Sequence, residues 1–384
     1  MANENNDAYQ AAGVDVAQAE NALSRITKRL RTTWPTPALS GLSSSGPGRV
    51  ALDFGKYANI VDLGGGNGLA LCADGVGTKA LIAQMLGKYD TIGIDCVAMN
   101  VNDLVCVGAK PLSLVDYIAV ERTDPHVLDQ ISIGLTNGAI QSGCSIPGGE
   151  IAEMPGVITG WQTGLGFDLA AMATGTVALD AVNIGADVAP GDVVVGIGSN
   201  GIHSNGMTLA RKVFFSDLGM TADTPVAEFG RSVGEELLEP TFIYVVESVA
   251  ALDQNLATGL IHITGEGFLN LTRVEAQVGF VLDALPDVPP VFRVMADQGG
   301  VATSDLYGIY NMGVGMALIA RPENADAVVA LAQSNGKPAQ VIGAVTADPG
   351  TVRITANGFT PVDLVNDGKT FRPEPQLRSR GPRE

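Results

Sequence analysis

The stretch Ala73-Asp74-Gly75-Val76-Gly77-Thr78-Lys79 constrains the fold of this chain more than any other segment. It follows the apolar run 69–72, which predicts a strand, and its two glycines predict a tight turn into a helix that begins near Lys79. Backbone amides at such a turn and the N-terminus of a helix both favour anions. We therefore expect Asp74, the loop amides and the Lys79 ammonium to surround a polyphosphate and its magnesium ion. The alternative is an ordinary strand-to-helix turn in which Asp74 caps the helix.

Glycine and charge narrow the classes of protein that the chain can belong to. Glycine makes up 48 of the 384 residues, well above the usual ~7%, and it occurs in short clusters without a period. This distribution favours functional turns over a fibrous protein. The net charge of −18 repels nucleic acid and anionic membrane surfaces, so an anionic ligand needs a local site.

The cysteines and the hydropathy pattern indicate the cellular compartment of the protein. The four cysteines, at positions 72, 96, 106 and 144, lie in apolar segments without C-x-x-C spacing. This predicts buried free thiols in a reducing compartment and argues against a zinc site. We see no signal-peptide pattern and no apolar stretch long enough to cross a bilayer. We expect a cytoplasmic protein without a nucleic-acid or membrane partner.

The patterns of the chain predict two domains. We expect an N-terminal helix and a Gly/Ser-rich loop in residues 1–50, an N-terminal domain over 51–178, a C-terminal domain over 179–365 and a disordered tail over 366–384. Hydrophobic spacing predicts strands over 69–72, 112–120, 167–179, 193–197 and 260–263, and helices over 15–30, 95–108, 125–141, 205–215 and 235–252. The loop 41–48 is either a linker or a lid over the phosphate site.

Several carboxylates of the first half fall at the junctions between loops and regular elements. Magnesium prefers hard oxygen ligands and often bridges a few carboxylates to substrate phosphates. Each carboxylate taken alone could be a helix cap or a solvated charge, and capping is a good alternative for Asp95, at the start of its helix. Asp95, Met99 and Asn102 share one stripe of that helix because their spacing is i, i+4, i+7. The carboxylates in question are Asp74, Asp95, Asp103, Asp116, Glu150 and Glu153.

Two of the three histidines lie in glycine-rich turns, His203 within 201–206 and His262 within 262–267. Histidine titrates near neutrality and could move protons during catalysis. The alternative for each is a packed core side chain. We expect Glu266 to hydrogen-bond the His262 imidazole and raise its pKa. His126 is expected at the surface.

Two nucleotide-binding fingerprints can be set aside. The segment 196–201 matches G-x-G-x-x-G after a predicted strand, but the following helix is expected only after His203-Ser204-Asn205. The order and spacing of Gly75 to Lys79 do not fit the G-x-x-x-x-G-K-[ST] loop. A nicotinamide site and a Walker loop are therefore not expected.

Seven motifs in order resemble the phosphoribosylformylglycinamidine cyclo-ligase family, also called aminoimidazole ribonucleotide synthetases. The resemblance covers nearly the whole chain. It implies an α/β (α+β) fold with a two-domain subunit, whose N-terminal mixed sheet forms a barrel across a homodimer with the second α/β domain beside it. It also implies ATP-dependent closure of formylglycinamidine ribonucleotide to 5-aminoimidazole ribonucleotide, releasing ADP and phosphate. The motifs are Tyr9–Asp15, Asp74–Lys79, Gly93–Asp95, Asn102–Asp103, Gly148–Glu150, His203–Gly206 and His262–Gly265.

The resemblance also implies roles for individual residues. The implied catalytic residues are His262, His203 and Lys79. ATP would be bound by Asp74, Gly75, Gly77, Thr78, Lys79, Asn102 and Asp103, and the ribonucleotide substrate by Ser204, Asn205 and Gly265. Magnesium would be held by Asp74, Asp95 and Glu150.

The chain departs from the family pattern at Gln10, Thr27, Phe242 and Glu266. Gln10 replaces a usual lysine, and Glu266 adds a negative charge near an anionic ligand. Relatives of the same fold remain alternatives: selenophosphate synthetase, thiamine-monophosphate kinase and a hydrogenase-maturation protein. The first would need a reactive N-terminal cysteine, whereas the first cysteine here is Cys72. A nucleotide-binding subunit without catalysis is the alternative from a different class.

Overall fold

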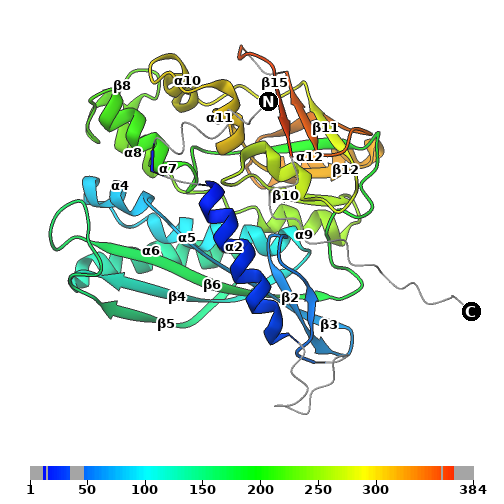
Figure 1. Cartoon of the computed structure of the whole chain (residues 1–384), viewed down its shortest axis with the longest axis horizontal. Coiled ribbons are helices and arrows are strands. Elements are labelled where there is room, and N and C mark those ends of the chain that lie inside the picture. The colour runs from blue at the N-terminus through cyan, green and yellow to red at the C-terminus, as the bar shows by residue number, and fades with distance from the viewer. Residues whose placement is uncertain (1–11, 14–15, 35–46, 356–357, 367–384) are drawn as a thin grey trace, which may run out of the picture.

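Two β-sheets organise the protein, one built from strands within residues 50–178 and the other from strands within 193–365. The computed structural model describes residues 12–13, 16–34, 47–355 and 358–366. In Figure 1 the N-terminal sheet lies below and the C-terminal sheet above, with helices between them. The result is a mixed α/β fold with two domains.

The N-terminal sheet has six strands in the order β1-β2-β3-β6-β4-β5, antiparallel except for the pair β4–β5. Its β6 strand alternates buried and exposed residues along its length, as expected for a sheet with one covered face. The strands are β1 (Val50–Leu52), β2 (Asn59–Gly64), β3 (Asn67–Gly75), β4 (Lys110–Val120), β5 (Ser145–Glu153) and β6 (Phe167–Ala178).

Helices cover one face of this sheet: α4 (Lys79–Leu86), α5 (Ile92–Cys106) and α6 (Pro125–Ser142). Helices α5 and α6 approach closely because glycines meet at their contact. A Cβ on Gly93 would lie 2.2 Å from the Leu135 backbone nitrogen, and one on Gly134 would lie 2.7 Å from the Gly93 nitrogen. Any larger residue there would force the helices apart.

The C-terminal sheet has seven strands in the order β10-β12-β7-β13-β11-β14-β15. Its β12 strand is buried at every residue, so both faces of the sheet are covered there. The strands are β7 (Val193–Gly198), β10 (Gly259–His262), β11 (Gly279–Leu282), β12 (Val314–Ala320), β13 (Ala339–Thr346), β14 (Thr351–Ile354) and β15 (Val362–Val365), with a separate hairpin of β8 (Pro225–Val226) and β9 (Arg231–Ser232).

Apart from α2, the remaining helical segments have ten residues or fewer. The α-helices are α2 (Val16–Leu30), α7 (Met207–Arg211), α8 (Val233–Leu238), α9 (Val245–Asp253), α10 (Pro290–Asp297), α11 (Thr303–Ile309) and α12 (Ala325–Ser334). A π-helix spans Lys212–Asp217, and 3-10 helices span Arg31–Thr33, Gly267–Arg273 and Pro322–Asn324.

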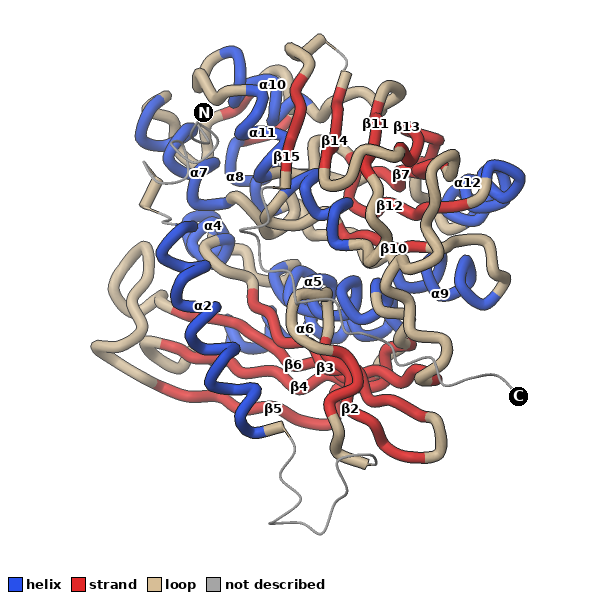
Figure 2. Tube along the Cα trace, turned by 45° about the vertical axis from the view of Figure 1, so that its right-hand side comes forward, coloured by secondary structure: helices blue, strands red, loops and turns tan. Residues whose placement is uncertain are grey.

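Helix α5 joins the two domains. It packs on β3 and β6 of its own sheet and also contacts β10 and α9 of the C-terminal domain. Figure 2 shows it running between the two sheets. Such a helix must be buried all round, and only Ile94 and Asp103 of its residues retain partial exposure. Polar residues on α5 are therefore placed to contact both domains.

Every predicted strand is present, and the helices predicted over 15–30 and 125–141 match α2 and α6. Three element predictions are wrong in part. Helix α5 begins at Ile92, so Asp95 lies inside the helix and does not cap it. The helix predicted over 235–252 is split into α8 and α9, because Pro240 cannot continue a helix. The helix predicted from Asn205 begins at Met207, because Gly206 has a left-handed φ of 70°.

Some predictions concern residues outside the described part of the chain. These are the Tyr9–Ala11 motif with its Gln10 substitution, most of the loop 41–48 and the tail beyond Asn366. Within the described part, all four cysteines are free, and Cys72, Cys96 and Cys106 are buried. No helix in that part has the length and apolar content needed to span a bilayer.

Candidate functional site

The site begins where β3 ends and α4 starts. Gly77 has a φ of +55°, and nothing lies within 4 Å of the position that its Cβ would occupy. Thr78 precedes the helix without capping it through its side chain. The loop therefore presents backbone groups and a helix N-terminus to open space, which is the arrangement that favours an anion.

Asp74 is held rigidly at this edge of the sheet. The Asn100 side chain accepts from the Asp74 backbone N–H and donates to its carbonyl, both at 3.1 Å. The Asp74 Oδ1 accepts from the Gly75 N–H at 2.7 Å. Burial, reinforced by the nearby Asp103 carboxylate, raises the pKa of Asp74 to about 6. Its surroundings thus disfavour the ionised form of the carboxylate, and a bound cation would favour that form.

A second carboxylate shares the face of the sheet on which Asp74 lies. Ala171 pairs with Asp74 on one side and with Asp116 on the other, so all three residues project from the same face. Burial also raises the pKa of Asp116. Two carboxylates with raised pKa values, on the strands that flank β6 on either side, are typical of functional sites.

Lys79 is not free to contact phosphate in this structure. Its side chain is fully buried, and its Nζ donates to Asp95 Oδ1 at 2.8 Å and to the Glu239 carbonyl at 2.6 Å. Burial lowers the pKa of the Lys79 ammonium, while Asp95 opposes this shift. The expected phosphate contact is replaced by a buried ion pair, because α5 brings Asp95 against the start of α4.

The expected magnesium ligands do not come together. Asp95 Oδ1 is occupied by Lys79, Thr241 and Ser204. Glu150 lies in β5 beside Tyr117, and thus on the face of the sheet opposite Asp74. No group of three or more metal-binding side chains is found among the described residues. The trio Asp74, Asp95 and Glu150 is therefore not one site; alternation along the strands separates its members.

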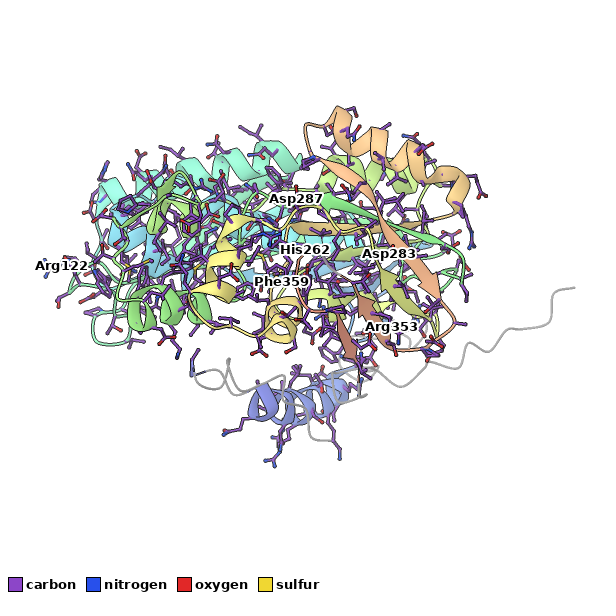
Figure 3. The ribbon with its side chains drawn as sticks, turned by 90° about the horizontal axis from the view of Figure 1, so that it is seen from above. Arg122, His262, Asp283, Asp287, Arg353 and Phe359 are labelled. Carbon is purple, nitrogen blue, oxygen red and sulfur yellow. The ribbon has the colours of Figure 1, made fainter. Side chains whose placement is uncertain are left out.

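His262 lies in the interior between the domains (Figure 3). Its Nδ1 is 2.8 Å from Asp103 Oδ1, and its Nε2 is 3.5 Å from Asn102 Nδ2. The Asn102 amide is fixed in orientation because its Oδ1 accepts from the Tyr244 N–H. Its Nδ2 therefore donates, so His262 Nε2 accepts and Nδ1 carries the proton. Asn102 and Asp103 thus bond to Tyr244 and His262 of the C-terminal domain. Both had been expected to contact ATP.

The predicted partner of His262 is wrong. Glu266 forms an ion pair with Arg273 at 2.9 Å and accepts from Asn270 at 3.1 Å. The His262 imidazole is held by Asp103 instead. The negative charge of Glu266 is therefore balanced within the C-terminal domain.

Among the described residues, His203 has no hydrogen-bond partner on either ring nitrogen, although its side chain is buried. Its φ of 65° is unusual for a residue other than glycine. Burial, together with nearby His262 and Lys79, lowers the pKa of His203 well below its ordinary value of 6.5. The ring is therefore neutral and can accept a proton.

The three expected substrate residues lie in two adjoining loops. A Cβ on Gly265 would lie 3.3 Å from Asn205 Oδ1. Asn205 Nδ2 is 3.9 Å from Met99 Sδ, and Ser204 Oγ donates to Asp95 at 3.0 Å. Ser204 is thus used internally, while Asn205 and Gly265 form a pair.

Sequence reasoning missed the segment Glu239–Tyr244, which it placed in a helix. Thr241 donates to Asp95 through its N–H and its hydroxyl, and the Phe242 carbonyl accepts from Asn102 at 2.9 Å. Pro240 was the available signal, because the residue before a proline disfavours the helical conformation. The substituted Phe242 takes part here through its backbone, while Thr27 bonds only to carbonyls of its own helix.

Family models match both halves of the chain. Residues 55–177 match the N-terminal domain of AIR synthase related proteins, and residues 189–355 match the C-terminal domain. The chain is 41% identical to the phosphoribosylformylglycinamidine cyclo-ligase of Methanothermobacter thermautotrophicus, over 88% of this chain and 94% of that protein. The chain belongs to the phosphoribosylformylglycinamidine cyclo-ligase family.

Solved structures of other proteins resemble this chain in fold at low sequence identity, and such a likeness shows the fold alone. Thiamine-monophosphate kinase from Stenotrophomonas maltophilia has a TM-score of 0.56 at 18% identity, covering 79% of this chain and 90% of that one. T. maritima PurL complexed with ADP has a TM-score of 0.54 at 16% identity, covering 86% of this chain and 48% of that one. The far higher identity to a cyclo-ligase favours the cyclo-ligase family over the same-fold alternatives.

Proposed function

We propose that this protein catalyses the ATP-dependent cyclisation of formylglycinamidine ribonucleotide to 5-aminoimidazole ribonucleotide, with release of ADP and phosphate, in purine biosynthesis. The observation that carries the proposal is the 41% identity to a named cyclo-ligase over nearly its full length. The structure supports it with an open anion-binding loop beside a half-buried carboxylate.

In this reaction ATP phosphorylates the formamide oxygen of the substrate. A substrate nitrogen then attacks the same carbon, and phosphate leaves as the ring closes. The Gly75 and Val76 amides donate to Asp74 Oδ1 and to the Leu169 carbonyl, so the amides of Gly77 and Thr78 and the N-terminus of α4 are proposed to bind the ATP phosphates. Because these donors are fixed before the ligand arrives, they stabilise charge without reorganising.

Asp74 fits a magnesium ion better than the other predicted ligands. Magnesium is usually held by one or two carboxylates together with substrate phosphates. Asp74 sits beside the anion-binding loop with a raised pKa, and Asp116 lies on the same face. Bound there, the metal would neutralise phosphate charge.

His203 and His262 receive different roles in this proposal. His203 is neutral and its ring nitrogens are unbonded, so it can accept a proton when the substrate reaches it. Both ring nitrogens of His262 already have neighbours, so we assign it to positioning. Asn205 and Gly265 are proposed to contact the ribonucleotide.

We propose that the protein acts as a homodimer through the open face of the N-terminal sheet. Val115, Tyr117 and Met172 are 38%, 42% and 43% exposed on that face. Val115 and Met172 are paired across β4 and β6, so they form one apolar surface. Exposed apolar patches of this kind mark association sites.

The deciding experiment is a turnover assay with purified protein, ATP, Mg²⁺ and formylglycinamidine ribonucleotide. We expect ADP release only when the ribonucleotide is present, with one imidazole product formed for each ADP. Nucleotide binding without turnover would instead support a non-catalytic nucleotide-binding subunit.

Asp74→Asn tests, in the same turnover assay, whether Asp74 holds the magnesium ion. The substitution keeps the shape and removes the charge, so turnover should fall about 10²–10³-fold, as when other preorganised charge-stabilising groups are lost. Asp168→Asn is a matched control. Its Oδ1 also accepts from the next backbone N–H, at 2.9 Å, but it lies on the opposite face of the sheet. Equal turnover in the two variants would remove Asp74 from the site.

A further inference from the structure

A single buried oxygen connects both loops of the proposed site. Asp95 Oδ1 accepts hydrogen bonds from Lys79 Nζ at 2.8 Å, from the Thr241 hydroxyl at 2.6 Å, from the Thr241 N–H at 2.9 Å and from Ser204 Oγ at 3.0 Å. Asp95 and Lys79 are completely buried, and Thr241 is 2% exposed. We call these four residues the Asp95 node.

The donors of the Asp95 node come from three separate segments. Lys79 is the first residue of α4, directly after the anion-binding loop. Thr241 lies in the segment between α8 and α9, and Ser204 lies in the loop that leads to α7. Asp95 itself is on α5. One carboxylate oxygen therefore fixes the nucleotide loop of one domain against the substrate loop of the other.

A second contact joins the same two loops independently. Thr78 Oγ1, at the end of the nucleotide loop, is 3.1 Å from Thr208 Oγ1, in the first turn of α7 after the loop 203–206. Lys79 also donates to the Glu239 carbonyl. Both loops are thus held from two sides, and their spacing is set by hydrogen-bond lengths instead of by apolar packing alone.

Stability alone is a poor explanation for the Asp95 node. Desolvation of a buried ion pair often offsets its attraction, so apolar residues of similar volume would hold the domains as well. Apolar packing does not fix direction, whereas hydrogen bonds have defined lengths and angles. A reaction between two bound substrates needs their relative positions to be fixed, because a misplacement of about 1 Å can cost ~10²-fold in rate.

We propose that Asp95 is a positioning residue, which sets the spacing between the loop 74–78 and the loop 203–206 so that bound ATP meets the ribonucleotide. This inference rests on the proposed function. It replaces the expected magnesium role of Asp95 and the expected phosphate role of Lys79. Occupation of either loop is transmitted to the other through the Asp95 node.

Thr241 offers the cleanest test because it touches neither proposed ligand. Thr241→Val removes one hydroxyl bond to Asp95 at nearly constant volume, whereas Thr241→Ser retains that hydroxyl. We expect kcat to fall about 10-fold or more in Thr241→Val, with the Kd for ADP changed less than about twofold, and Thr241→Ser to stay within about threefold of the unmodified protein. Thr272→Val is the control for the loss of a buried threonine hydroxyl away from the node: Thr272 is 3% exposed, and its hydroxyl donates to the Leu269 carbonyl and accepts from Asn366 Nδ2.

Equal kcat in Thr241→Val, Thr241→Ser and Thr272→Val would overturn the proposal. So would a loss in Thr241→Val that appears only as weaker ADP binding. If ADP binds to no form of the protein, the proposed function itself has failed, and this outcome differs from binding with unaltered kcat.

A measurement on the unmodified protein covers the case in which Thr241→Val does not fold. Hydrogen exchange of peptides that span residues 201–207 is followed with and without saturating ADP. We expect ADP to slow exchange there, because the nucleotide loop and this loop share Asp95. Slowed exchange confined to peptides over residues 74–79 would overturn the coupling.

Discussion

The two sheets of this protein are covered to different extents. In the C-terminal sheet, every residue of β12 is buried, so neither face of that strand meets solvent. In the N-terminal sheet, β6 alternates between buried and exposed residues, and large apolar side chains remain on the open face. The C-terminal sheet is enclosed on both faces at β12, whereas the N-terminal sheet leaves apolar side chains on an open face.

The same contrast extends to the titratable groups. Asp74, at the edge of the N-terminal sheet, is partly exposed and has a raised pKa. His203 of the C-terminal domain is buried and has a lowered pKa. Burial thus acts in opposite directions on the two groups, because it disfavours the charged form of each: the carboxylate of Asp74 and the imidazolium of His203.

The largest effect is expected from Leu318→Asp in β12. Leu318 is completely buried, so the new carboxylate would have neither water nor a counter-ion, at a cost of about 4 kcal/mol or more. We expect the protein to lose its cooperative unfolding transition, as followed by circular dichroism in urea. A midpoint close to that of the unmodified protein would show that β12 is less enclosed than described.

Val115→Asp makes the same chemical change on the open face of the N-terminal sheet. We expect the subunit to stay folded, because Val115 is 38% exposed. The proposed dimer should weaken by about 3–5 kcal/mol, the usual cost of an unpaired charge in an interface. Sedimentation velocity at micromolar concentration measures the change. A monomeric unmodified protein with full activity would contradict the dimer.

Asp74→Asn should stabilise the protein at alkaline pH. The pKa of Asp74 is raised from 3.8 to about 6, so the folded state binds the proton more tightly than the unfolded state. The ionised carboxylate then destabilises the fold, by about 3 kcal/mol once the pH exceeds 6. Urea unfolding of metal-free protein between pH 5 and 8 should show a gain that shrinks below pH 6. Asp168→Asn, unfolded under the same conditions, controls for the loss of one carboxylate from the sheet.

The smallest effect is expected from His203→Asn. The folded pKa of His203 is lowered below 6.5, so its neutral form stabilises the fold above that pH and the benefit is lost as the pH falls. This contributes a slope of up to about 1.4 kcal/mol per pH unit. Asparagine tolerates the positive φ, and its variant should lack that part of the slope between pH 6.5 and 5. The exposed His126→Asn controls for the substitution itself, and urea unfolding of both variants across this pH range measures the difference.

Much of the fold followed from local pattern. Alternating and continuous apolar runs located the strands, and the helix expected from Pro125 is α6, which the structure shows to be capped by Asp124. The spacing of Asp95, Met99 and Asn102 correctly placed them on one stripe. That stripe contacts the C-terminal domain, which no local pattern indicates, because its partners lie more than 100 residues away.

The sequence by itself determined the family and the strand-to-helix turn at Asp74, where glycine allows the positive φ of Gly77. Only the tertiary structure decided which charges are free. Lys79 and Asp95 neutralise each other because α5 is buried between two domains. Glu150 is separated from Asp74 because successive residues along a strand face opposite sides of the sheet, and Glu150 pairs with Tyr117 instead of Asp116. A motif specifies the residue types, but long-range burial decides whether each polar group meets a ligand or another part of the chain.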